Sequence, residues 1–278
     1  MFKKIAIIGV GLIGGSIGLA VKEKKLAKEV IGIGRRRSSI RNALKKGAVD
    51  RATLDLREGV KEADLIIVAT SVDKVMTKIK EAAPCAKAKA IIIDVNGTKK
   101  NVVEYADKIM PKRICFVGTH PLAGLDQSGV LFADSRLFDN TVCIITPTRH
   151  TNKTALRKII RFWERLSARV KILSPQAHDI VVARVSHLPH ILSYNLCSII
   201  SSKDIKMAGS GFKDTTRIAK SNPDMWADIF LQNRSNLLRS IDDFERSLKV
   251  LKSYIIRNKK EQLLKRLAIA KGKRESIG

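Results

Sequence analysis

Residues 5–21 read IAIIGVGLIGGSIGLAV: an apolar run, a glycine-rich turn and a second apolar stretch that reads as a helix. In this context of strand, tight turn and helix, the pattern G-x-G-x-x-G indicates dinucleotide binding. The first glycine makes the turn, the second lets the backbone approach a pyrophosphate, and the third lets the helix pack on the strand. The helix N-terminus offers free N–H groups and a positive dipole end to the phosphates. We therefore expect cofactor contacts from the motif residues Gly9, Gly11, Leu12, Ile13 and Gly14.

The same stretch has a second interpretation, because Lys3 and Lys4 followed by apolar residues resemble a signal peptide or a membrane anchor. The run from Ile5 to Val21 is shorter than the roughly 20 residues that a membrane span needs, and its glycines disfavour a helix. We see no cleavage pattern and no other long apolar stretch. We therefore expect a soluble, cytoplasmic protein with no membrane partner.

Composition sets the broad class of the protein. A length of 278 residues suits one large domain or two modest ones, and a hydrophobic content of 45% is enough for real cores. The four cysteines are widely spaced, which is typical of reduced core thiols in a cytosolic protein. Histidine and cysteine do not cluster at zinc-ligand spacing, so we expect no metal.

A formal net charge of +27 invites a nucleic-acid interpretation. Lysine and arginine are nevertheless spread along the whole chain, and aromatic residues, which could stack on bases, make up only 5%. We therefore favour a lysine-rich solvated surface and expect no nucleic-acid partner. A positive field also attracts anionic substrates and phosphates, which suits the glycine turn.

The first half of the chain alternates short apolar strands with amphipathic helical stretches. Strands are expected at residues 4–8, 29–33, 65–69, 90–94, 115–117, 142–146 and 170–173, and helices at 40–46, 73–83 and 100–109. Such alternation predicts a mainly parallel sheet with helices on both faces. We therefore predict an α/β, Rossmann-type doubly wound domain over residues 1–174.

Strand signals vanish beyond Pro175, and residues 177–200, 224–251 and 258–271 all read as helices. We place a domain boundary near residue 174 and expect an all-helical domain over residues 175–278. Long helices with apolar stripes often pair across a two-fold axis, which predicts a homodimer formed through these helices. The charged tail at residues 271–278 is expected to be disordered.

The end of the second expected strand bears on the choice of cofactor. In this fold, an acidic residue roughly 20 positions beyond the glycine turn binds the adenosine ribose of NAD. This chain instead has Gly34 followed by three arginines, which leave room for a 2′-phosphate and supply charge to bind it. We therefore expect Arg35 and Arg36 to contact the cofactor, and NADP to be preferred over NAD; the alternative is a solvated helix start. We also assign to cofactor binding Thr70, Ser71 and Asp94, which stand at the ends of expected strands.

Residues 118–124 read GTHPLAG and follow a strand at the carboxyl edge of the expected sheet. Open α/β sheets bind their ligands at that edge. His120, held on this loop between glycine and proline, is well placed as a general acid or base.

Two further motifs lie in the helical half. The pair His178-Asp179 is followed by His187 and His190, which are three residues apart and share a face if they are helical. A metal site is conceivable, but three histidines and one aspartate at mixed helical phase suit ordinary hydrogen-bonded helix positions better. Residues 208–219 read AGSGFKDTTRIA, a glycine segment that leads into a charged helix start, which Asp214 or Thr215 can cap. Arg217 can pair bidentately with a substrate carboxylate, or form a surface pair with an acidic residue.

Together these motifs resemble the prephenate/arogenate dehydrogenase family of tyrosine biosynthesis. The stretches that carry the resemblance are GVGLIGGS, GTHPLAG, the pair His178-Asp179 with SHLPH, and GFKDTTRIA with PDMW, and they run in family order from Gly9 to Trp226. The resemblance implies a Rossmann domain, a helical dimerisation domain, and NAD(P)-dependent oxidative decarboxylation of prephenate to 4-hydroxyphenylpyruvate. The related substrate arogenate would give tyrosine directly.

The resemblance also assigns roles to residues. His120 falls on the catalytic histidine, which accepts the proton of the ring hydroxyl. His190 falls on a substrate-contacting histidine, Arg217 on the arginine that binds a substrate carboxylate, and Trp226 lies near that pocket. We add Lys213 and Thr119 to the expected substrate contacts.

The chain departs from the family pattern at two positions. Gly97 stands where the family usually has a serine that organises the hydroxyl and the nicotinamide, and Lys213 stands where arginine is common. Two alternatives to prephenate or arogenate oxidation remain open: another two-domain NAD(P)-dependent reductase, and a non-enzymatic dinucleotide sensor or nucleic-acid binder.

Overall fold

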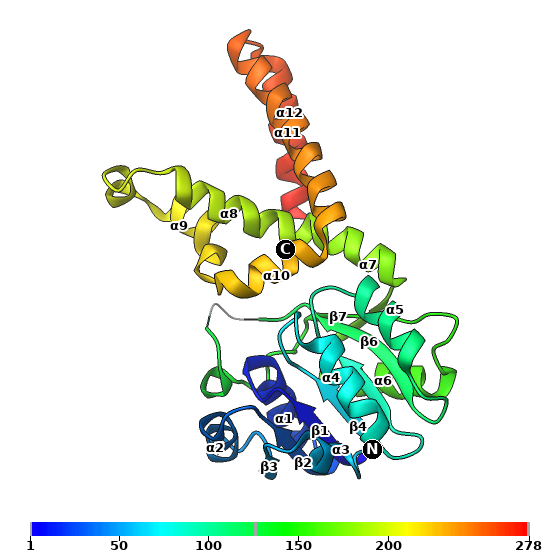
Figure 1. The fold of residues 1–278 in the computed structure, drawn as a ribbon. Coiled ribbons are helices and arrows are strands. Elements are labelled where there is room, and N and C mark those ends of the chain that lie inside the picture. The colour runs from blue at the N-terminus through cyan, green and yellow to red at the C-terminus, as the bar shows by residue number, and fades with distance from the viewer. Residues whose placement is uncertain (1, 125–126, 277–278) are drawn as a thin grey trace. The chain divides into compact units, whose positions relative to one another are not determined.

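The computed structural model describes residues 2–124 and 127–276. The chain divides into two compact units, Met1–Asn233 and Arg234–Gly278. The first unit contains a sheet with flanking helices and a helical segment that follows it (Figure 1). The second unit contains the last two helices.

One eight-stranded sheet organises the first unit, with the order β3-β2-β1-β4-β5-β6-β7-β8. Neighbouring strands are parallel except β6 and β7, which pair antiparallel. The strands are β1 (Phe2–Ile8), β2 (Ala27–Ile33), β3 (Arg51–Thr53), β4 (Leu65–Val68), β5 (Ile91–Asp94), β6 (Cys115–Pro121), β7 (Val142–Thr146) and β8 (Arg169–Ile172). The predicted Rossmann-type, mainly parallel sheet is confirmed, although the sequence pattern does not predict β3.

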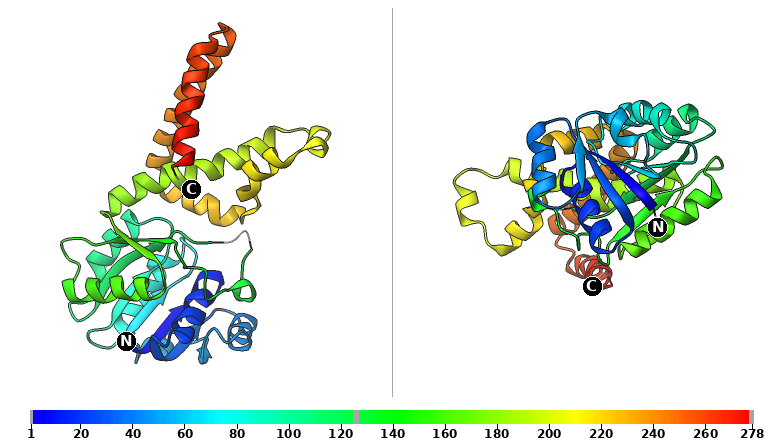
Figure 2. Two further views of the ribbon diagram at one scale, coloured as in Figure 1. Left: turned by 180° about the vertical axis from the view of Figure 1, so that it is seen from behind. Right: turned by 90° about the horizontal axis from the view of Figure 1, so that it is seen from below.

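Helices cover both faces of the sheet (Figure 2). Successive residues of β1 point to opposite faces, so Ile5 and Ile7 enter one apolar cluster while Ala6 and Ile8 enter the other. The first cluster packs against α1 (Leu12–Glu23), α2 (Arg37–Lys45) and α6 (Lys153–Arg165). The second packs against α3 (Leu56–Val60), α4 (Val75–Ala82) and α5 (Lys100–Ile109). Because both faces are covered, the strands can be almost wholly apolar.

A helical segment completes the first unit. It consists of α7 (Pro175–Val182), a π-helical turn at Ala183–His187, α8 (Leu188–Ile199), α9 (Ser210–Thr216) and α10 (Pro223–Gln232), with short 3₁₀ turns at Asp204–Met207 and Arg217–Lys220. The helix expected over 177–200 is therefore present but contains a π turn. Pro189 lies in the first turn of α8.

The single helix expected over 224–251 is wrong. The chain leaves helical geometry at Asn233, and α11 (Arg234–Ile256) begins immediately afterwards. At this position φ is −106° and ψ is 28°, and the side-chain amide of Asn233 donates a hydrogen bond to the backbone oxygen of Asp179 at 2.7 Å. A contact so distant in sequence leaves no mark on the local helical pattern.

The second unit is a hairpin of α11 and α12 (Lys260–Glu275), coloured orange and red in Figure 1. Arg266 of α12 donates to the hydroxyl of Ser247 of α11 at 2.9 Å. The disorder expected for 271–278 is wrong for its first five residues, because α12 continues to Glu275; residues 277 and 278 lie outside the described part. No helix in the described ranges is long and apolar enough to cross a membrane.

Candidate active site

The glycine turn joins β1 to α1 in the middle of the sheet, where the strand order reverses from β1 toward β2 on one side and β4 on the other. Gly9 has φ +97°, and a Cβ there would lie 2.6 Å from the backbone oxygen of Ala69. A Cβ on Gly14 would lie 2.1 Å from the backbone oxygen of Gly9. Gly11 is the N-cap residue of α1, and a Cβ there would have no described protein atom within 4 Å. Two glycines are thus required by the fold, whereas the third faces open space at a helix N-terminus.

Two clefts meet at this turn. One, of about 440 Å³, runs between the turn and the start of α2; the other, of about 420 Å³, runs between the turn and the loop after β4. Among their lining residues are the expected cofactor contacts Gly9, Gly11, Arg35, Arg36, Thr70 and Ser71. Leu12 and Ile13 lie half-buried in the first turn of α1.

His120 lies on β6, not on a loop as expected from the sequence. The strand Cys115–Pro121 is longer than predicted because Thr119, His120 and Pro121 pair with β7. Strand pairing fixes the backbone of His120, which directs its ring toward α7. The Nδ1 atom of His120 lies 2.8 Å from Nε2 of His178.

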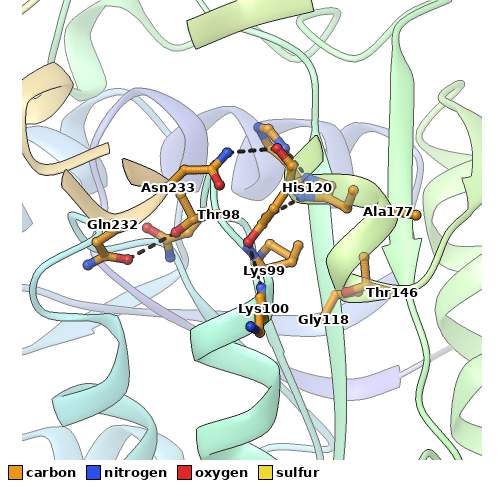
Figure 3. Close-up of polar contacts among 12 residues, drawn as sticks. Thr98, Lys99, Lys100, Gly118, His120, Thr146, Ala177, Gln232 and Asn233 are labelled. Carbon is orange, nitrogen blue, oxygen red and sulfur yellow. Dashed lines mark hydrogen bonds and ion pairs between the residues drawn. The ribbon is translucent and has the colours of Figure 1, made fainter. Parts of the chain in front are cut away.

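His178 and Asp179, on α7, continue this contact into a chain of three side chains. Nδ1 of His178 lies 2.8 Å from Oδ1 of Asp179. The backbone N–H of Lys99 donates to Oδ1 of Asp179 at 2.8 Å, and that of Lys100 donates to Oδ2 at 3.0 Å (Figure 3). Asp179 therefore ties α7 to the start of α5 and presents a buried carboxylate to His178.

Asp94 and Thr119 have their polar groups turned into the protein. The Lys99 ammonium forms an ion pair with Asp94, and both side chains are fully buried. The backbone N–H of Asn96 donates to the Asp94 carboxylate at 3.1 Å, and the Thr119 hydroxyl donates to the backbone oxygen of Asp94. In this arrangement Asp94 and Thr119 shape the end of β5 and the start of the next loop beside His120.

Burial dominates the electrostatics of the histidines. It lowers the pKa of His120 well below 6.5, and the nearby His178 and Lys99 lower this pKa further. Burial also lowers the pKa of His178, although Asp179 opposes the shift. Burial raises the pKa of Asp179, but hydrogen bonds from His178 and two backbone N–H groups outweigh it, so the net pKa is lowered. Near neutral pH the site therefore holds two neutral imidazoles and one carboxylate.

His187 and His190 share a helix face, and both rings contact Trp226. The His190 ring stacks on Trp226 with centroids 3.5 Å apart, and the His187 ring meets it edge-on at 6.0 Å. His187 is buried, and its Nδ1 lies 3.2 Å from the amide nitrogen of Asn233. The expected substrate contacts His190 and Trp226 are thus side by side, and Asn233 joins their group to Asp179.

Gly97 lies opposite the second ring nitrogen of His120. A Cβ at Gly97 would lie 3.9 Å from His120 Nε2 and 3.8 Å from Ile229 Cδ1, so a small side chain would fit there without a clash. Nearby, the amide nitrogen of Asn96 is buried with no hydrogen-bond partner among the described residues. Thr70 Oγ1 and Trp226 Nε1 are likewise buried and have no hydrogen-bond partner in the described part of the chain. Buried polar atoms without partners are unusual, and a bound ligand can satisfy them.

Arg217 and Lys213 lie on a different element from His120. Lys213 is on α9, and Arg217 begins the 3₁₀ turn that follows it; both are exposed. Their segment is joined to α8, the helix of His190, because the Ser193 hydroxyl donates to the backbone oxygen of Thr215 at 2.9 Å. Asp214 and Thr215 do not cap this helix as expected, since Gly209 is the N-cap and both residues lie inside α9.

Sequence reasoning missed His178, Asp179 and Asn233 as parts of one site. The sequence offers His178 and Asp179 as part of a weak metal candidate with the nearby histidines and as one of the stretches that carry the family resemblance, but it gives neither residue a role beside His120. Across residues 2–124 and 127–276, no group of three or more His, Cys, Asp or Glu side chains is placed to hold a metal ion. The sequence feature that could have pointed to them is the adjacent pair His178-Asp179, three residues after the proline that begins the helix. This pair suggests a histidine oriented by a neighbouring carboxylate, but it does not show which residue the histidine contacts.

We expect the folded protein to lose stability as pH falls from about 6.5 toward 4. Burial lowers the pKa of His187 from 6.5 to about 4, so in this window the unfolded chain binds a proton that the folded chain does not. The difference corresponds to a loss on the order of 3 kcal/mol. His120 and His178 act in the same direction. Urea unfolding at several pH values measures the effect.

The matched variants for this prediction are His187→Phe and His150→Phe. The first removes one buried titrating ring and should reduce the pH dependence by the share of His187, whereas the second removes an exposed ring and should leave it unchanged. An unfolding free energy that stays constant from pH 7 to pH 4.5 would contradict the prediction.

The chain is similar to known proteins along its whole length. Residues 17–172 match the family model described as prephenate dehydrogenase, nucleotide-binding domain, and residues 174–269 match prephenate dehydrogenase, dimerization domain. The chain is 36% identical to prephenate dehydrogenase of Bacillus subtilis, over 98% of this chain and 76% of the relative.

Two solved structures are similar to the present one. Prephenate dehydrogenase from Aquifex aeolicus, in complex with hydroxyphenyl propionate and NAD⁺, is 33% identical, with a TM-score of 0.93 over 100% of this chain and 99% of the other. Arogenate dehydrogenase from Synechocystis is 29% identical, with a TM-score of 0.84 over 99% of this chain and 100% of the other.

Proposed function

This chain belongs to the prephenate dehydrogenase family, and on that premise we propose that it converts prephenate to 4-hydroxyphenylpyruvate by oxidative decarboxylation. The observation that carries the proposal is the full-length likeness to the Aquifex aeolicus enzyme, whose bound hydroxyphenyl propionate has the ring and side-chain length of that product. The protein is an oxidoreductase that uses a nicotinamide dinucleotide.

The residues at the glycine turn fit the cofactor. The open space beside Gly11, at the N-terminus of α1, suits a pyrophosphate, and the Thr70 hydroxyl and Asn96 amide, unpartnered among the described residues, can serve a ligand that extends toward His120. When bound, the nicotinamide accepts a hydride. The protein supplies orientation and a proton acceptor.

His120 is the proposed proton acceptor. Hydride leaves the hydroxyl-bearing ring carbon, the hydroxyl proton passes to Nε2 of His120, and a carbonyl forms. The bond to the ring carboxylate then breaks and CO₂ departs; the electron pair of that bond completes an aromatic ring, and the resulting phenolate oxygen takes a proton back to give the hydroxyl of the product. The lowered pKa of His120 supports this role, because a base must be unprotonated at neutral pH before it can accept a proton.

The substrate is a dianion, and we propose that Arg217 binds one of its carboxylates beside His190 and Trp226. Support comes from the stacked His190 and Trp226 rings and from the position of the Arg217 segment against the helix that carries His190. Lys213 on the same segment adds positive charge. The overall net charge of +27 favours the approach of such an anion.

The direct test is purified protein with prephenate and either NAD⁺ or NADP⁺, followed by the absorbance of the reduced nicotinamide. Reduction with prephenate supports the proposal, and reduction with arogenate alone would indicate the second candidate, which the likeness to the Synechocystis arogenate dehydrogenase favours. No reduction with either would reject both. A panel of small hydroxyacids, and duplex DNA at varied salt concentration, then addresses the reductase and binding-protein alternatives.

We further propose that NADP is preferred over NAD. Arg35 lines both clefts at the glycine turn and Arg36 lines one, and the second strand ends without a carboxylate. Each charged hydrogen bond to a 2′-phosphate contributes about 1.5–3 kcal/mol. Arg35→Ala with Arg36→Ala should therefore lower kcat/KM for NADP⁺ by at least about tenfold and change that for NAD⁺ little.

The control for this prediction is Arg41→Ala. Arg41 is an exposed arginine on the same helix, α2, and it lines neither cleft. Steady-state kinetics with both cofactors decide the matter. A wild-type protein with higher kcat/KM for NAD⁺ would refute the preference.

A homodimer formed through the C-terminal half is also proposed, with a domain boundary near residue 174. Support comes from the dimerization-domain match over residues 174–269 and from exposed apolar side chains on the hairpin, among them Leu248, Ile255, Ile256, Leu264 and Leu267. Light scattering should give twice the monomer mass. The cytoplasmic location stays a prediction.

A further inference from the structure

The proposed reaction uses His120 but assigns nothing to His178 and Asp179. Both residues are buried, His178 completely, and the structure joins them to the ring of the proposed base. The contact between the two histidines is a nitrogen-to-nitrogen contact of 2.8 Å. One nitrogen must therefore carry the hydrogen and the other must accept it.

The donors and acceptors in the series His120–His178–Asp179 can be assigned by starting from Asp179. Asp179 receives hydrogen bonds from the backbone N–H groups of Lys99 and Lys100, which can only donate. Its carboxylate is therefore an acceptor, and Nδ1 of His178 must donate to it. In a neutral ring, Nε2 of His178 is then the acceptor. His120 must place its hydrogen on Nδ1 and keep the lone pair on Nε2.

The lone pair of His120 is thereby aimed at the place where the reaction needs it. Nε2 of His120 faces the open position beside Gly97, where a Cβ would lie 3.9 Å away, and the Asn96 amide, unpartnered within the described ranges, belongs to the preceding residue. Its Nδ1 faces His178. The opposite tautomer would leave two lone pairs facing each other across 2.8 Å and would point an N–H toward the substrate.

The surrounding charges favour the same arrangement. Within residues 2–124 and 127–276, the charged groups near the two rings are Lys99, before α5, which pairs with Asp94 at the end of β5, and Asp179 on α7. In the same part of the chain, His187 in the π turn is a further titratable neighbour of His120, and Cys143 on β7 lies near His120 and the Asp94 ion pair. Among the residues that the structure describes, Asp179 is the one anion joined to the histidine pair by a hydrogen bond. It can therefore stabilise positive charge that reaches the pair.

We propose that His178, oriented by Asp179, is a positioning residue that holds His120 in the Nδ1–H tautomer, so that Nε2 is the base that receives the hydroxyl proton of the substrate. This inference rests on the proposed function. During the step, the O–H bond of the substrate breaks and a new N–H bond forms at Nε2, while the hydride goes to the nicotinamide. The resulting imidazolium of His120 keeps its Nδ1–H hydrogen bond to His178, and His178 keeps its own to the Asp179 carboxylate.

The first measurement needs no turnover. The whole protein is labelled with ¹⁵N-histidine, and the ring-nitrogen chemical shifts of His120, identified by their loss in His120→Asn, report which nitrogen carries hydrogen. We expect Nδ1 protonated and Nε2 unprotonated in the wild type. In His178→Phe, which removes the acceptor and keeps a ring, His120 should shift toward the Nε2–H tautomer.

The second measurement is kinetic. His178→Phe should lower kcat roughly 10- to 100-fold and change the KM for prephenate less than about threefold, since His120 stays in place but is wrongly protonated. His178→Gln restores an acceptor opposite Nδ1 and should recover much of the lost kcat. His150→Phe, at an exposed histidine, is the matched control and should be unchanged. Thermal unfolding confirms that each variant is folded.

The outcomes separate this inference from the proposed function. A wild-type His120 with hydrogen on Nε2 would overturn the inference, as would a folded His178→Phe with kcat near that of the wild type, or a His178→Gln as impaired as His178→Phe. If His178→Phe does not fold, the wild-type spectrum and His178→Gln still decide. A wild type with the expected tautomer but no activity on prephenate or arogenate would refute the proposed function alone.

Discussion

Replacement of His120 by asparagine is expected to lower kcat for prephenate about 10²–10⁴-fold, which is the usual contribution of a general base. Asparagine can still hydrogen-bond the ring hydroxyl, but it cannot accept its proton. The affinity for prephenate should therefore remain largely intact. Steady-state kinetics give kcat, and equilibrium binding with the reduced cofactor gives the affinity separately.

The matched control is His150→Asn, because His150 is exposed and lies in the turn after β7, outside the candidate site. Its kinetics should equal those of the wild type. Full retained activity in His120→Asn would exclude His120 as the base, and a loss confined to KM would instead make it a binding residue.

Replacement of Arg217 by alanine is expected to weaken prephenate binding by about 2–4 kcal/mol, the cost of breaking one charged pair with a carboxylate. The effect should appear chiefly in KM, with a smaller change in kcat. Arg217→Lys keeps the charge but not the planar fork, and should fall between wild type and alanine. Kinetics over a wide range of prephenate concentration measure the difference.

Arg161→Ala serves as the control, since Arg161 is an exposed arginine on α6, a helix that packs against the sheet. It tests whether the loss of any one positive charge weakens anion binding. If Arg217→Ala and Arg161→Ala change KM equally, long-range charge accounts for the effect, and Arg217 has no direct role. An unchanged KM in Arg217→Ala would also reject the proposal.

Much of the fold could be predicted because its strands are local apolar runs between turn signals. The glycine turn, the strands beside it and the helix Lys100–Ile109 could all be predicted from the spacing of apolar residues and from the turn residues between the apolar runs. The strand Arg51–Thr53 could not be found, since three residues paired only to β2 carry too little pattern. The break at Asn233 was missed because the helical pattern of apolar residues continues through it, while the contact of the Asn233 side chain with Asp179 joins residues 54 positions apart.

Less of the candidate site than of the fold could be predicted from the sequence. His120 could be selected from its neighbours in sequence, and His190 and Trp226 from the family motifs. The contact between His120 and His178 joins residues 58 positions apart, and the ion pair of Lys99 with Asp94 needs a core that excludes water from both. The sequence shows which polar side chains the site can use. Which of them donate and which accept hydrogen bonds is decided by the packing of strand β6, helix α7 and the start of α5 against one another.

The π turn at Ala183–His187 sets the phase between α7, which carries His178, and α8, which carries His190. One residue fewer in this turn would rotate α8 by about 100° about its axis, because an α-helix has 3.6 residues per turn. His190 would then leave the face of Trp226 while α7 kept its place. The number of residues across this joint therefore fixes which face of α8 meets Trp226, and deletion of one residue from the turn should change which substrate the pocket accepts.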